Sequence, residues 1–374
     1  MTSSLDVCIR GSGAVGLGLA LALARQGLQV GLVGDPAAAA SAADVRAYAL
    51  NAASRSLLAG LKVWDALPAD AVTAVDDMHI EGDAAGAAID FSAWRAGAEA
   101  LAWIVDAAEL EAALRTAARY APHLQWLTAA QADAASASLT VLAEGKASAR
   151  RSALGVHFDV HVYGHTALAA RLVASAPHTG LARQWFRNPD VLALLPFDRP
   201  QPACSYALVW SLPAERAALL HKAPVADFEA ALAEATGGAA GQLRLASARA
   251  AWPLAVAHAD RLCGPGWVLV GDAAHLVHPL AGQGLNLGLA DVASLARVIA
   301  GREAWRALSD ETLLRRHVRE RAGPTQAMTL LTDGLLQLFS QPQPGLRELR
   351  NRGMSLLNRI APIKWALIRR ALDA

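Results

Sequence analysis

A glycine-rich turn between a predicted strand and a predicted helix constrains this chain more than any other feature of its sequence. Residues 5–9 are typical of a short buried strand, and Gly11, Gly13 and Gly16 follow with the spacing G-x-G-x-x-G. The pattern then predicts a helix over residues 17–26. In a dinucleotide-binding βαβ unit these glycines permit the tight turn, the approach of a pyrophosphate and close helix packing. The alternative is a tight turn without a ligand.

A second strand is predicted over residues 28–33. An acidic residue at the end of this strand is expected to hold the adenosine ribose. Gly34 occupies that position, and Asp35 follows it. Two interpretations of Asp35 stay open: a ribose ligand, or a loop residue that starts the turn at Pro36.

Composition excludes several classes of protein. The chain has 374 residues, enough for one large or two ordinary domains, and 54% of them are hydrophobic against 18% charged, which argues against disorder. A formal net charge of +1 gives no general attraction to nucleic acid, and we expect no nucleic-acid partner. The three cysteines lie far apart, so we expect no disulfide framework, no metal site and a reducing, cytoplasmic location.

The high mean hydropathy of +0.27 raises the question of a membrane span. Much of it comes from alanine, and no apolar run reaches the roughly 18 residues that a spanning helix needs. The N-terminal stretch from Gly11 imitates a signal peptide, but Asp6 precedes it and no basic segment does. We therefore expect a mature intracellular protein.

A second nucleotide-binding signal lies in the C-terminal half. Residues 267–270 predict another buried strand, which breaks into Gly-Asp-Ala-Ala-His and then into residues 278–286, His-Pro-Leu-Ala-Gly-Gln-Gly-Leu-Asn. A helix is predicted over residues 287–299. Gly282 and Gly284 let the backbone approach a flat ligand, and the helix start favours an anion.

At these residues the sequence resembles the flavin-dependent aromatic hydroxylases, most closely their ubiquinone-biosynthesis branch. The segment GDAAHLVHPLAGQGLNLGLADVASLA is similar to that branch's FAD motif, and DVRAYALNAASRSLL (44–58) to the segment whose arginine, here Arg46, lies beside the flavin. YGHTALAARL (163–172), PHTGLARQWF (177–186), LALLPF (192–197) and YALVWSLP (206–213) resemble strands of the substrate domain. The resemblance covers most of the chain.

The resemblance implies an α/β fold similar to that of p-hydroxybenzoate hydroxylase. We expect a discontinuous Rossmann-like FAD-binding domain from residues 1–75, 101–155 and 252–325. An antiparallel-sheet substrate domain is expected from 76–100 and 156–251, where alternating runs suggest a sheet that roofs a ligand cavity. C-terminal helices are expected over 326–374, and a helical excursion over 214–236.

The resemblance also implies a reaction and its site. With NAD(P)H and O2, the protein would hydroxylate an electron-rich aromatic ring through a C4a-hydroperoxyflavin, and the expected substrate is a polyprenylated phenol in ubiquinone biosynthesis. His278 and Pro279 are the candidate catalytic residues, although His278 is open to interpretation as an ordinary loop histidine. Asp272 is expected to hold the ribityl or pyrophosphate region of FAD, or alternatively to cap the next turn. The candidate FAD-binding residues are Gly11, Gly13, Ala14, Val15, Gly16, Asp35, Arg46, Gly271, Asp272, Pro279, Gly282, Gln283, Gly284, Leu285 and Asn286.

Several residues depart from the family's pattern. The family usually has glutamate where Gly34 stands, an aliphatic residue at Arg10, and aspartate and arginine where Glu144 and Ala147 stand. The stretch between residues 119 and 144 is short for the family's usual β-hairpins. These departures bear on the use of FAD and NAD(P)H.

The last thirty residues, 345–374, are amphipathic and carry seven basic against two acidic side chains, which is 7 − 2 = +5. Two interpretations stay open: helices packed on the nucleotide domain with a solvated basic face, or a peripheral contact with the inner membrane that brings the protein to a lipid-soluble substrate. Two alternative functions also remain. One is the hydroxylation of another aromatic compound, and the other is a non-catalytic subunit of a quinone-biosynthesis complex.

Overall fold

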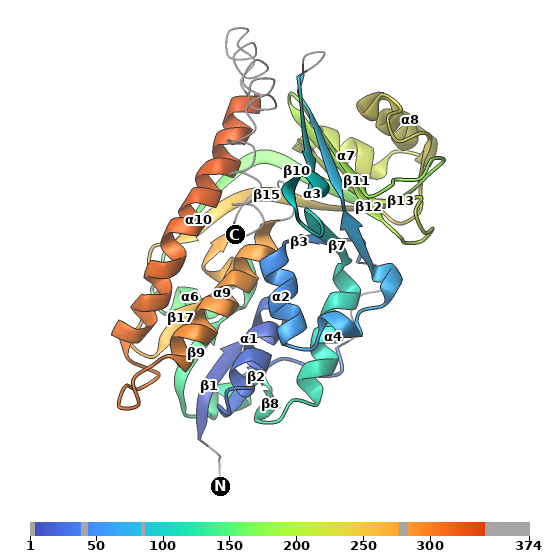
Figure 1. Ribbon diagram of the computed structural model, residues 1–374. Helices are drawn as coiled ribbons and strands as arrows, with labels where there is room; N and C mark the ends of the chain where they lie inside the picture. Colours follow the sequence, from blue (N-terminus) through green and yellow to red (C-terminus); the bar gives the residue numbers. More distant parts are fainter. Residues whose placement is uncertain (1–3, 39–43, 84–86, 277–282, 341–374) are drawn as a thin grey trace.

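The computed structural model describes residues 4–38, 44–83, 87–276 and 283–340, which form two large sheets with helices packed on them (Figure 1). The predicted opening βαβ unit is confirmed by β1 (Leu5–Arg10), α1 (Ala14–Ala24) and β2 (Val30–Val33). Helix α1 begins at Ala14 rather than at residue 17, directly after the glycine turn. Its N-terminus therefore lies close to the end of β1.

A six-stranded sheet surrounds β1 in the order β16-β17-β9-β1-β2-β8. Five of its strands are parallel, and β16 pairs antiparallel with β17 at one edge. The further strands are β8 (Leu124–Leu127), β9 (Ala137–Leu142), β16 (Cys263–Gly264) and β17 (Trp267–Leu269). Because parallel strands end at the same edge, the turns after β1, β9 and β17 come together.

Helices cover both faces of this sheet. Helix α1 packs between α4 (Ala107–Arg119) and α9 (Gln283–Ala300), and every residue of α1 except Val15 is buried. A helix buried on all sides is apolar on all sides, which explains its run of alanine, leucine and glycine. Helices α5 (Ala129–Ala134) and α6 (Ala149–Ala153) and the long α10 (Glu311–Ser340) complete this half, where α10 packs on α9.

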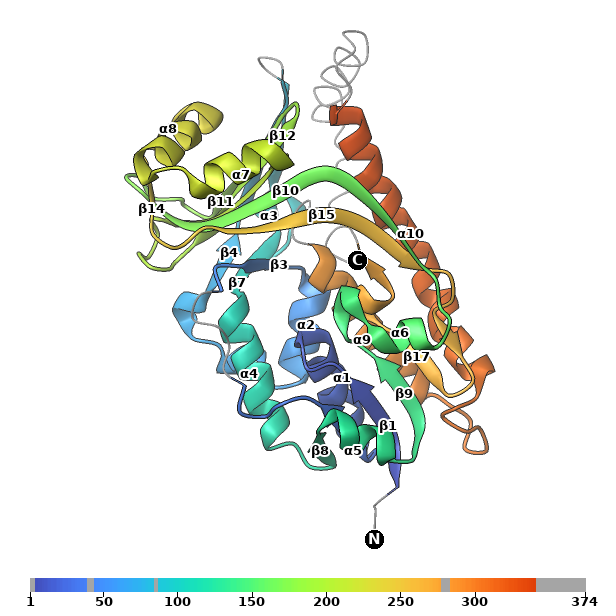
Figure 2. The same cartoon turned by 180° about the vertical axis from the view of Figure 1, so that it is seen from behind.

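The second large sheet has nine strands in the order β18-β15-β10-β13-β12-β11-β5-β6, with β14 paired to β10. All pairs are antiparallel except β11 with β5. The strands are β5 (Asp77–Glu81), β6 (Ala88–Ser92), β10 (Phe158–Ala174), β11 (Leu181–Arg187), β12 (Asp190–Phe197), β13 (Ser205–Pro213), β14 (Leu243–Leu245), β15 (Ala250–Ala259) and β18 (His275–Leu276). The long pair β10 and β15 extends from this sheet toward α10 (Figure 2).

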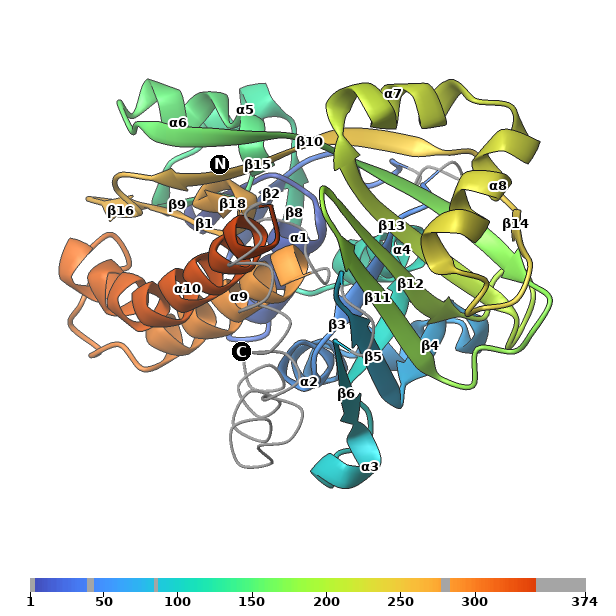
Figure 3. The same ribbon diagram turned by 90° about the horizontal axis from the view of Figure 1, so that it is seen from above.

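The helical excursion predicted over 214–236 is confirmed as α7 (Ala214–Lys222) and α8 (Val225–Thr236). These two helices cover one face of the nine-stranded sheet (Figure 3). Phe228 and Leu232 of α8 and Trp210 of β13 belong to one buried apolar cluster beneath them. The opposite face of this sheet is thereby left to face the six-stranded half.

A three-stranded sheet lies between the two halves and has the order β3-β7-β4. Its strands are β3 (Ala47–Leu50), β4 (Val72–Val75) and β7 (Ala102–Asp106), with α2 (Ala52–Gly60) and α3 (Ala93–Ala96) nearby in the chain. Short 3-10 turns are η1 (Trp64–Ala66), η2 (Ala69–Ala71), η3 (Gly145–Ala147) and η4 (Gly271–Ala273).

The domain boundaries given in the sequence analysis stay a prediction. One detail differs from that division: residues 252–259, grouped there with the nucleotide-binding segments, lie in β15 of the nine-stranded sheet. The basic tail over 345–374 lies outside the described residues. Within the described ranges, no helix combines the length and apolarity needed to cross a membrane.

The apolar cluster under α7 and α8 yields a matched pair of substitutions. Leu232 is 0% exposed, whereas Leu219 of α7 is 73% exposed. Leu232→Ala is expected to lower the free energy of unfolding by about 2–5 kcal/mol because it removes packed methyl groups and leaves a cavity. Leu219→Ala is expected to change it by less than about 0.5 kcal/mol. Urea denaturation followed by circular dichroism measures both, and equal shifts of the two midpoints would contradict the packing described here.

Candidate active site

A cavity of about 690 Å³ lies between the first turn of α1 and the face of the nine-stranded sheet opposite α7 and α8. We call its sheet side the roof, formed by Ala169, Ala207, Leu208, Val209 and residues 252–255. The remaining wall comes from β3, α4, the η3 and η4 turns, Leu276 and the start of α9. This volume is typical of sites for small molecules and cofactors. The predicted sheet-roofed cavity is therefore present.

The N-terminus of α1 opens into this cavity. Gly13 precedes the helix without any side-chain cap, and Gly13, Ala14 and Val15 line the cavity. A Cβ atom added to Gly13 would meet nothing within 4 Å, so space lies directly before the free N–H groups. Uncapped helix N-termini of this kind bind phosphate groups.

Gly11 and Gly16 fulfil a different requirement, which is the close approach of neighbouring backbones. A Cβ atom on Gly16 would lie 1.9 Å from the Gly11 carbonyl oxygen, and one on Gly11 would lie 2.2 Å from the Ala143 carbonyl oxygen. Gly11 also has a φ of +111°, which side chains disfavour. These two glycines hold β1, α1 and the end of β9 together beneath the cavity.

Arg151 joins the turns that follow β9 and β17. Its guanidinium donates hydrogen bonds to the carbonyl of Lys146 in η3 at 2.8 Å and to that of Ala273 in η4 at 2.9 Å. The same group lies 3.5 Å from the ring centre of Phe158, at the start of β10. Glu144, which accepts a hydrogen bond from Ser148, and Lys146 line the cavity.

Tyr48 of β3 and Arg46, directly before that strand, both line the cavity. The Arg46 guanidinium pairs with the Asp44 carboxylate at 2.6 Å and lies 3.7 Å from the Glu111 carboxylate of α4. It also lies 5.8 Å from the Tyr48 ring centre. Burial raises the pKa of Tyr48 to about 12, so its hydroxyl stays protonated at neutral pH.

Asp272 lies in η4 and faces the cavity. Its side chain is exposed to the cavity. Desolvation by the surrounding walls raises the pKa of Asp272 above its usual value, and the charges of His275, Lys146 and Arg46 oppose this shift. The structure gives Asp272 no capping hydrogen bond within the described residues. The position fits the predicted contact with a cofactor, which stays a prediction.

The η4 turn is fixed by a buried carboxylate on α9. Asp291, 2% exposed, accepts hydrogen bonds from the Gly271 amide at 2.9 Å and from His275 Nε2 at 2.7 Å through the same oxygen. Its other oxygen accepts from Arg321 Nε of α10 at 2.8 Å. These ionic and hydrogen-bond partners hold the pKa of Asp291 well below its usual range despite burial. The η4 turn is thereby attached to both α9 and α10.

The other candidate residues are placed differently. Asp35 is exposed and accepts a hydrogen bond from the Ala37 amide at 2.8 Å, which matches its interpretation as a turn residue. Asn286 is buried and bonds to the backbone of Ala49 and Asn51, so it joins α9 to β3 and α2, and its contact with a cofactor stays a prediction. Gly284 and Leu285 do line the cavity, and Gly271 lies beneath it against Val15. His278, Pro279 and Gly282 lie outside the described residues, as does the side chain of Gln283.

Two residues that line the cavity, Tyr48 and Glu111, were not predicted from the sequence. Tyr48 follows Arg46 by two positions, and strand alternation places both on one face, so this signal was available. Glu111 comes from the second turn of a separate helix, and only the tertiary packing brings it near Arg46. The unusual Arg10 is also explained: it pairs with Asp133 of α5, which Arg150 contacts as well.

The model of the FAD binding domain family matches residues 4–331. Ubiquinone hydroxylase UbiL of Rhodospirillum rubrum is 30% identical, over 98% of this chain and 89% of that protein. The 3-demethoxyubiquinol 3-hydroxylase of Escherichia coli is also 30% identical, over 98% of either chain.

Solved structures share the fold. Pseudomonas aeruginosa PqsL in complex with 2-aminobenzoylacetate gives a TM-score of 0.77 at 21% identity, covering 94% of this chain and 99% of that one. Klebsiella pneumoniae HpxO complexed with FAD and uric acid gives 0.71 at 18% identity, covering 99% and 98%. The predicted fold class is confirmed by these likenesses.

Two glycine substitutions separate folding from binding. Gly16→Ala is expected to destabilise the chain, because its Cβ would lie 1.9 Å from the Gly11 carbonyl oxygen. Gly13→Ala is expected to keep the wild-type melting temperature but to weaken FAD binding about tenfold or more, equivalent to about 1.4 kcal/mol. Thermal unfolding and flavin fluorescence titration measure the two effects. Unchanged FAD affinity in Gly13→Ala would place the dinucleotide elsewhere.

His317 gives a prediction for pH. It lies in α10, and its Nδ1 contacts Ser294 Oγ at 2.9 Å. Burial lowers its pKa from 6.5 to about 4, opposed by Asp291 and Glu320. Between these values the unfolded chain binds a proton that the folded chain does not. The free energy of unfolding is therefore expected to decrease as the pH is lowered from 6.5 to about 4, by at most about 1.4 kcal/mol per pH unit from this group.

The control for this effect is His317→Asn, whose amide can donate to Ser294 but does not titrate. Denaturation midpoints measured from pH 7 to pH 4 should fall less steeply in the variant than in the unchanged chain. In the same window His275, whose pKa is raised, keeps its full contribution, and Asp291, whose pKa is lowered, stays charged. Parallel pH curves for the two proteins would show that His317 is not the titrating group.

Proposed function

Because this chain belongs to the FAD binding domain family, we propose that it is an FAD-dependent monooxygenase that hydroxylates the ring of a polyprenylated phenol in ubiquinone biosynthesis. The cavity between the α1 N-terminus and the roof carries this proposal, since one space joins an uncapped helix N-terminus to an apolar sheet face. The names of the two relatives that match nearly the whole chain support the substrate class.

The residues present fit an FAD. The uncapped helix start at Gly13 offers N–H groups to the pyrophosphate, and the space before it is open. Arg46 and Lys146 bring positive charge to the cavity, and Asp272 brings a carboxylate that can accept hydrogen bonds from ribityl or ribose hydroxyls. When bound, FAD supplies the redox chemistry by which electrons from NAD(P)H and one atom of O2 convert a ring C–H into C–OH, with water as the other product.

The chain's own part is to bind, orient and exclude water. None of the described roof residues that line the cavity is charged, and several are alanines that leave room for a flat ring. An apolar wall favours a neutral aromatic substrate and keeps water from the reacting atoms. The Tyr48 hydroxyl, protonated at neutral pH, is a donor on the facing wall that can orient a phenol oxygen.

We further propose a peripheral contact with the cytoplasmic face of the inner membrane through the basic segment 345–374. The support is its net charge of +5, from seven basic and two acidic residues, together with the lipid solubility of the proposed substrate. Attachment to a quinone-biosynthesis complex is the other arrangement that would bring such a substrate to the cavity.

The first experiment is the visible absorption spectrum of the purified protein before and after addition of FAD. Flavin bands that persist through desalting are expected. The holoprotein is then mixed with 2-geranylphenol and NADH or NADPH, and the expected results are phenol-dependent NAD(P)H oxidation and a product that has gained one oxygen atom. A colourless protein that does not retain FAD would overturn the proposal in favour of a non-catalytic subunit. Retained FAD with turnover only on other aromatic compounds would overturn the substrate class alone.

A further inference from the structure

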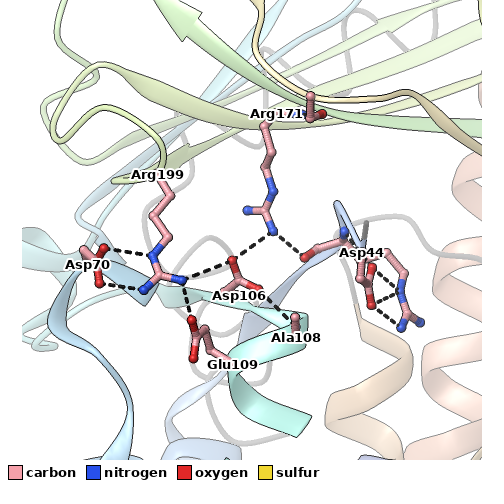
Figure 4. Close-up of polar contacts among 9 residues, drawn as sticks. Asp44, Asp70, Asp106, Ala108, Glu109, Arg171 and Arg199 are labelled. Carbon is pink, nitrogen blue, oxygen red and sulfur yellow. Dashed lines mark hydrogen bonds and ion pairs between the residues drawn. The ribbon is translucent and has the colours of Figure 1, made fainter. Parts of the chain in front are cut away.

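Three parts of the cavity wall meet at one buried arginine. Arg171 lies on β10, two residues beyond Ala169 of the roof, and pairs in the sheet with the roof residue Ala207. It is 7% exposed, and its guanidinium lies 4.1 Å from the ring centre of the buried Phe197. Figure 4 shows its side chain extending from the roof sheet toward Asp106 at the start of α4.

The contacts of Arg171 converge on the backbone of Arg46. One guanidinium nitrogen donates to the Arg46 carbonyl oxygen at 2.7 Å and to the Asp106 carboxylate at 3.4 Å. The same Arg46 carbonyl accepts a hydrogen bond from the Ala107 amide at 3.2 Å. The residue whose side chain lies in the cavity beside Tyr48 is therefore fixed at its backbone from the roof sheet and from α4 together.

The contact of Arg171 with Asp106 also bears on the position of a second cavity side chain, that of Glu111. Asp106 caps α4 by accepting a hydrogen bond from the Ala108 amide at 3.0 Å. Glu111 follows in the same helix, lines the cavity and lies 3.7 Å from the Arg46 guanidinium. The position of Arg171 relative to the first turn of α4 therefore influences both charged groups on this wall.

Arg199 belongs to the same cluster but contacts different groups. It binds both oxygens of Asp70 at 2.8 and 2.9 Å and Glu109 at 2.7 Å, and lies 3.8 Å from Asp106 (Figure 4). Its side chain is 26% exposed, and it does not line the cavity. Arg171, in contrast, has one buried nitrogen without a hydrogen-bond partner in the described structure, an arrangement that lowers stability. Stability alone therefore does not explain an arginine at position 171.

We propose that Arg171 is a positioning residue that sets the placement of the Arg46 segment relative to the roof, and thereby the placement of the substrate ring relative to the cofactor. The inference rests on the proposed function, in which the roof contacts the phenol and the Arg46 wall contacts the FAD. A change at Arg171 then alters the match between ring and cofactor without removing any group that touches either one.

The reaction offers a readout that is specific for such a mismatch. In the coupled reaction, NAD(P)H, a proton, O2 and the ring C–H give NAD(P)+, water and the ring C–OH. When the ring is misplaced, the same two electrons and protons reduce O2 to hydrogen peroxide, and the ring is unchanged. The ratio of peroxide to NAD(P)H consumed therefore reports placement, whereas a general loss of folded protein lowers both amounts together.

The test uses full-length holoprotein saturated with FAD, with 2-geranylphenol as the probe. Arg171→Met is expected to raise the peroxide fraction at least threefold and to change the visible circular dichroism of the bound FAD. Arg171→Lys, which keeps the charge but can make fewer hydrogen bonds, is expected to lie between Arg171→Met and the unchanged chain. The matched control Arg199→Met, which removes an arginine from the same cluster, is expected to match the unchanged chain in both measurements.

Several results would overturn the inference. A wild-type peroxide fraction and dichroism spectrum in Arg171→Met would do so, as would equal changes in Arg171→Met and Arg199→Met. If Arg171→Met does not fold, Arg171→Lys decides alone, and wild-type values in that variant count against the proposal. Failure of the unchanged chain to oxidise NAD(P)H with the phenol would overturn the proposed function, while the dichroism comparison still tests the placement of the Arg46 segment. Failure of the unchanged chain to bind FAD would overturn both.

Discussion

The hydrogen bonds of the buried Asp291 carboxylate are the interactions on which the η4 side of the cavity depends. A charge removed from water is unfavourable unless hydrogen bonds and an opposite charge compensate it. Gly271 of the η4 turn, His275 of β18 and Arg321 of α10 supply that compensation, at 2.7–2.9 Å. Loss of any of these partners would leave a buried charge less well compensated, so the contacts stabilise the position of the turn that carries Asp272 relative to α9 and α10. The same contacts therefore hold the part of the cavity wall that Asp272 forms.

The opening of the fold could be predicted because its constraints are local. Strand, glycine turn and helix follow one another within residues 5–24, and steric rules alone require glycine at positions 11 and 16. The cavity wall could be predicted only in part, because its residues come from distant segments. Arg46 was found by resemblance, but its contact with Glu111 depends on how α4 packs. The expected contact of Asn286 with the cofactor stays a prediction, and its bonds to the backbone of Ala49 and Asn51 could not be predicted because they depend on how α9 packs against β3 and α2.

The departure at Gly34 has a steric explanation in the structure. A Cβ atom at this position would lie 2.4 Å from the Ser12 hydroxyl oxygen and 2.6 Å from its Cβ. The side chain of Ser12, in the middle of the glycine turn, therefore fills the place that a larger residue at 34 would need. Arg115 of α4 holds the same corner by donating to the carbonyls of Ser12 and Asp35. Glycine at position 34 thus fits a corner that is filled by the Ser12 side chain and held by the hydrogen bonds of Arg115.

The pairing of β15 with β18 has a consequence for how the cavity can change shape. Ala257 pairs with Leu276 and His258 with His275, so the roof and the strand that follows the η4 turn belong to one hydrogen-bonded sheet. Two walls joined in this way move as one body, because separating them would break a row of backbone hydrogen bonds. The opposite wall, formed by β3 and α4, is joined to the same sheet by Arg171, which donates hydrogen bonds to the Arg46 carbonyl and to Asp106. A change in the shape of the cavity therefore requires hydrogen bonds between one of its walls and this sheet to break.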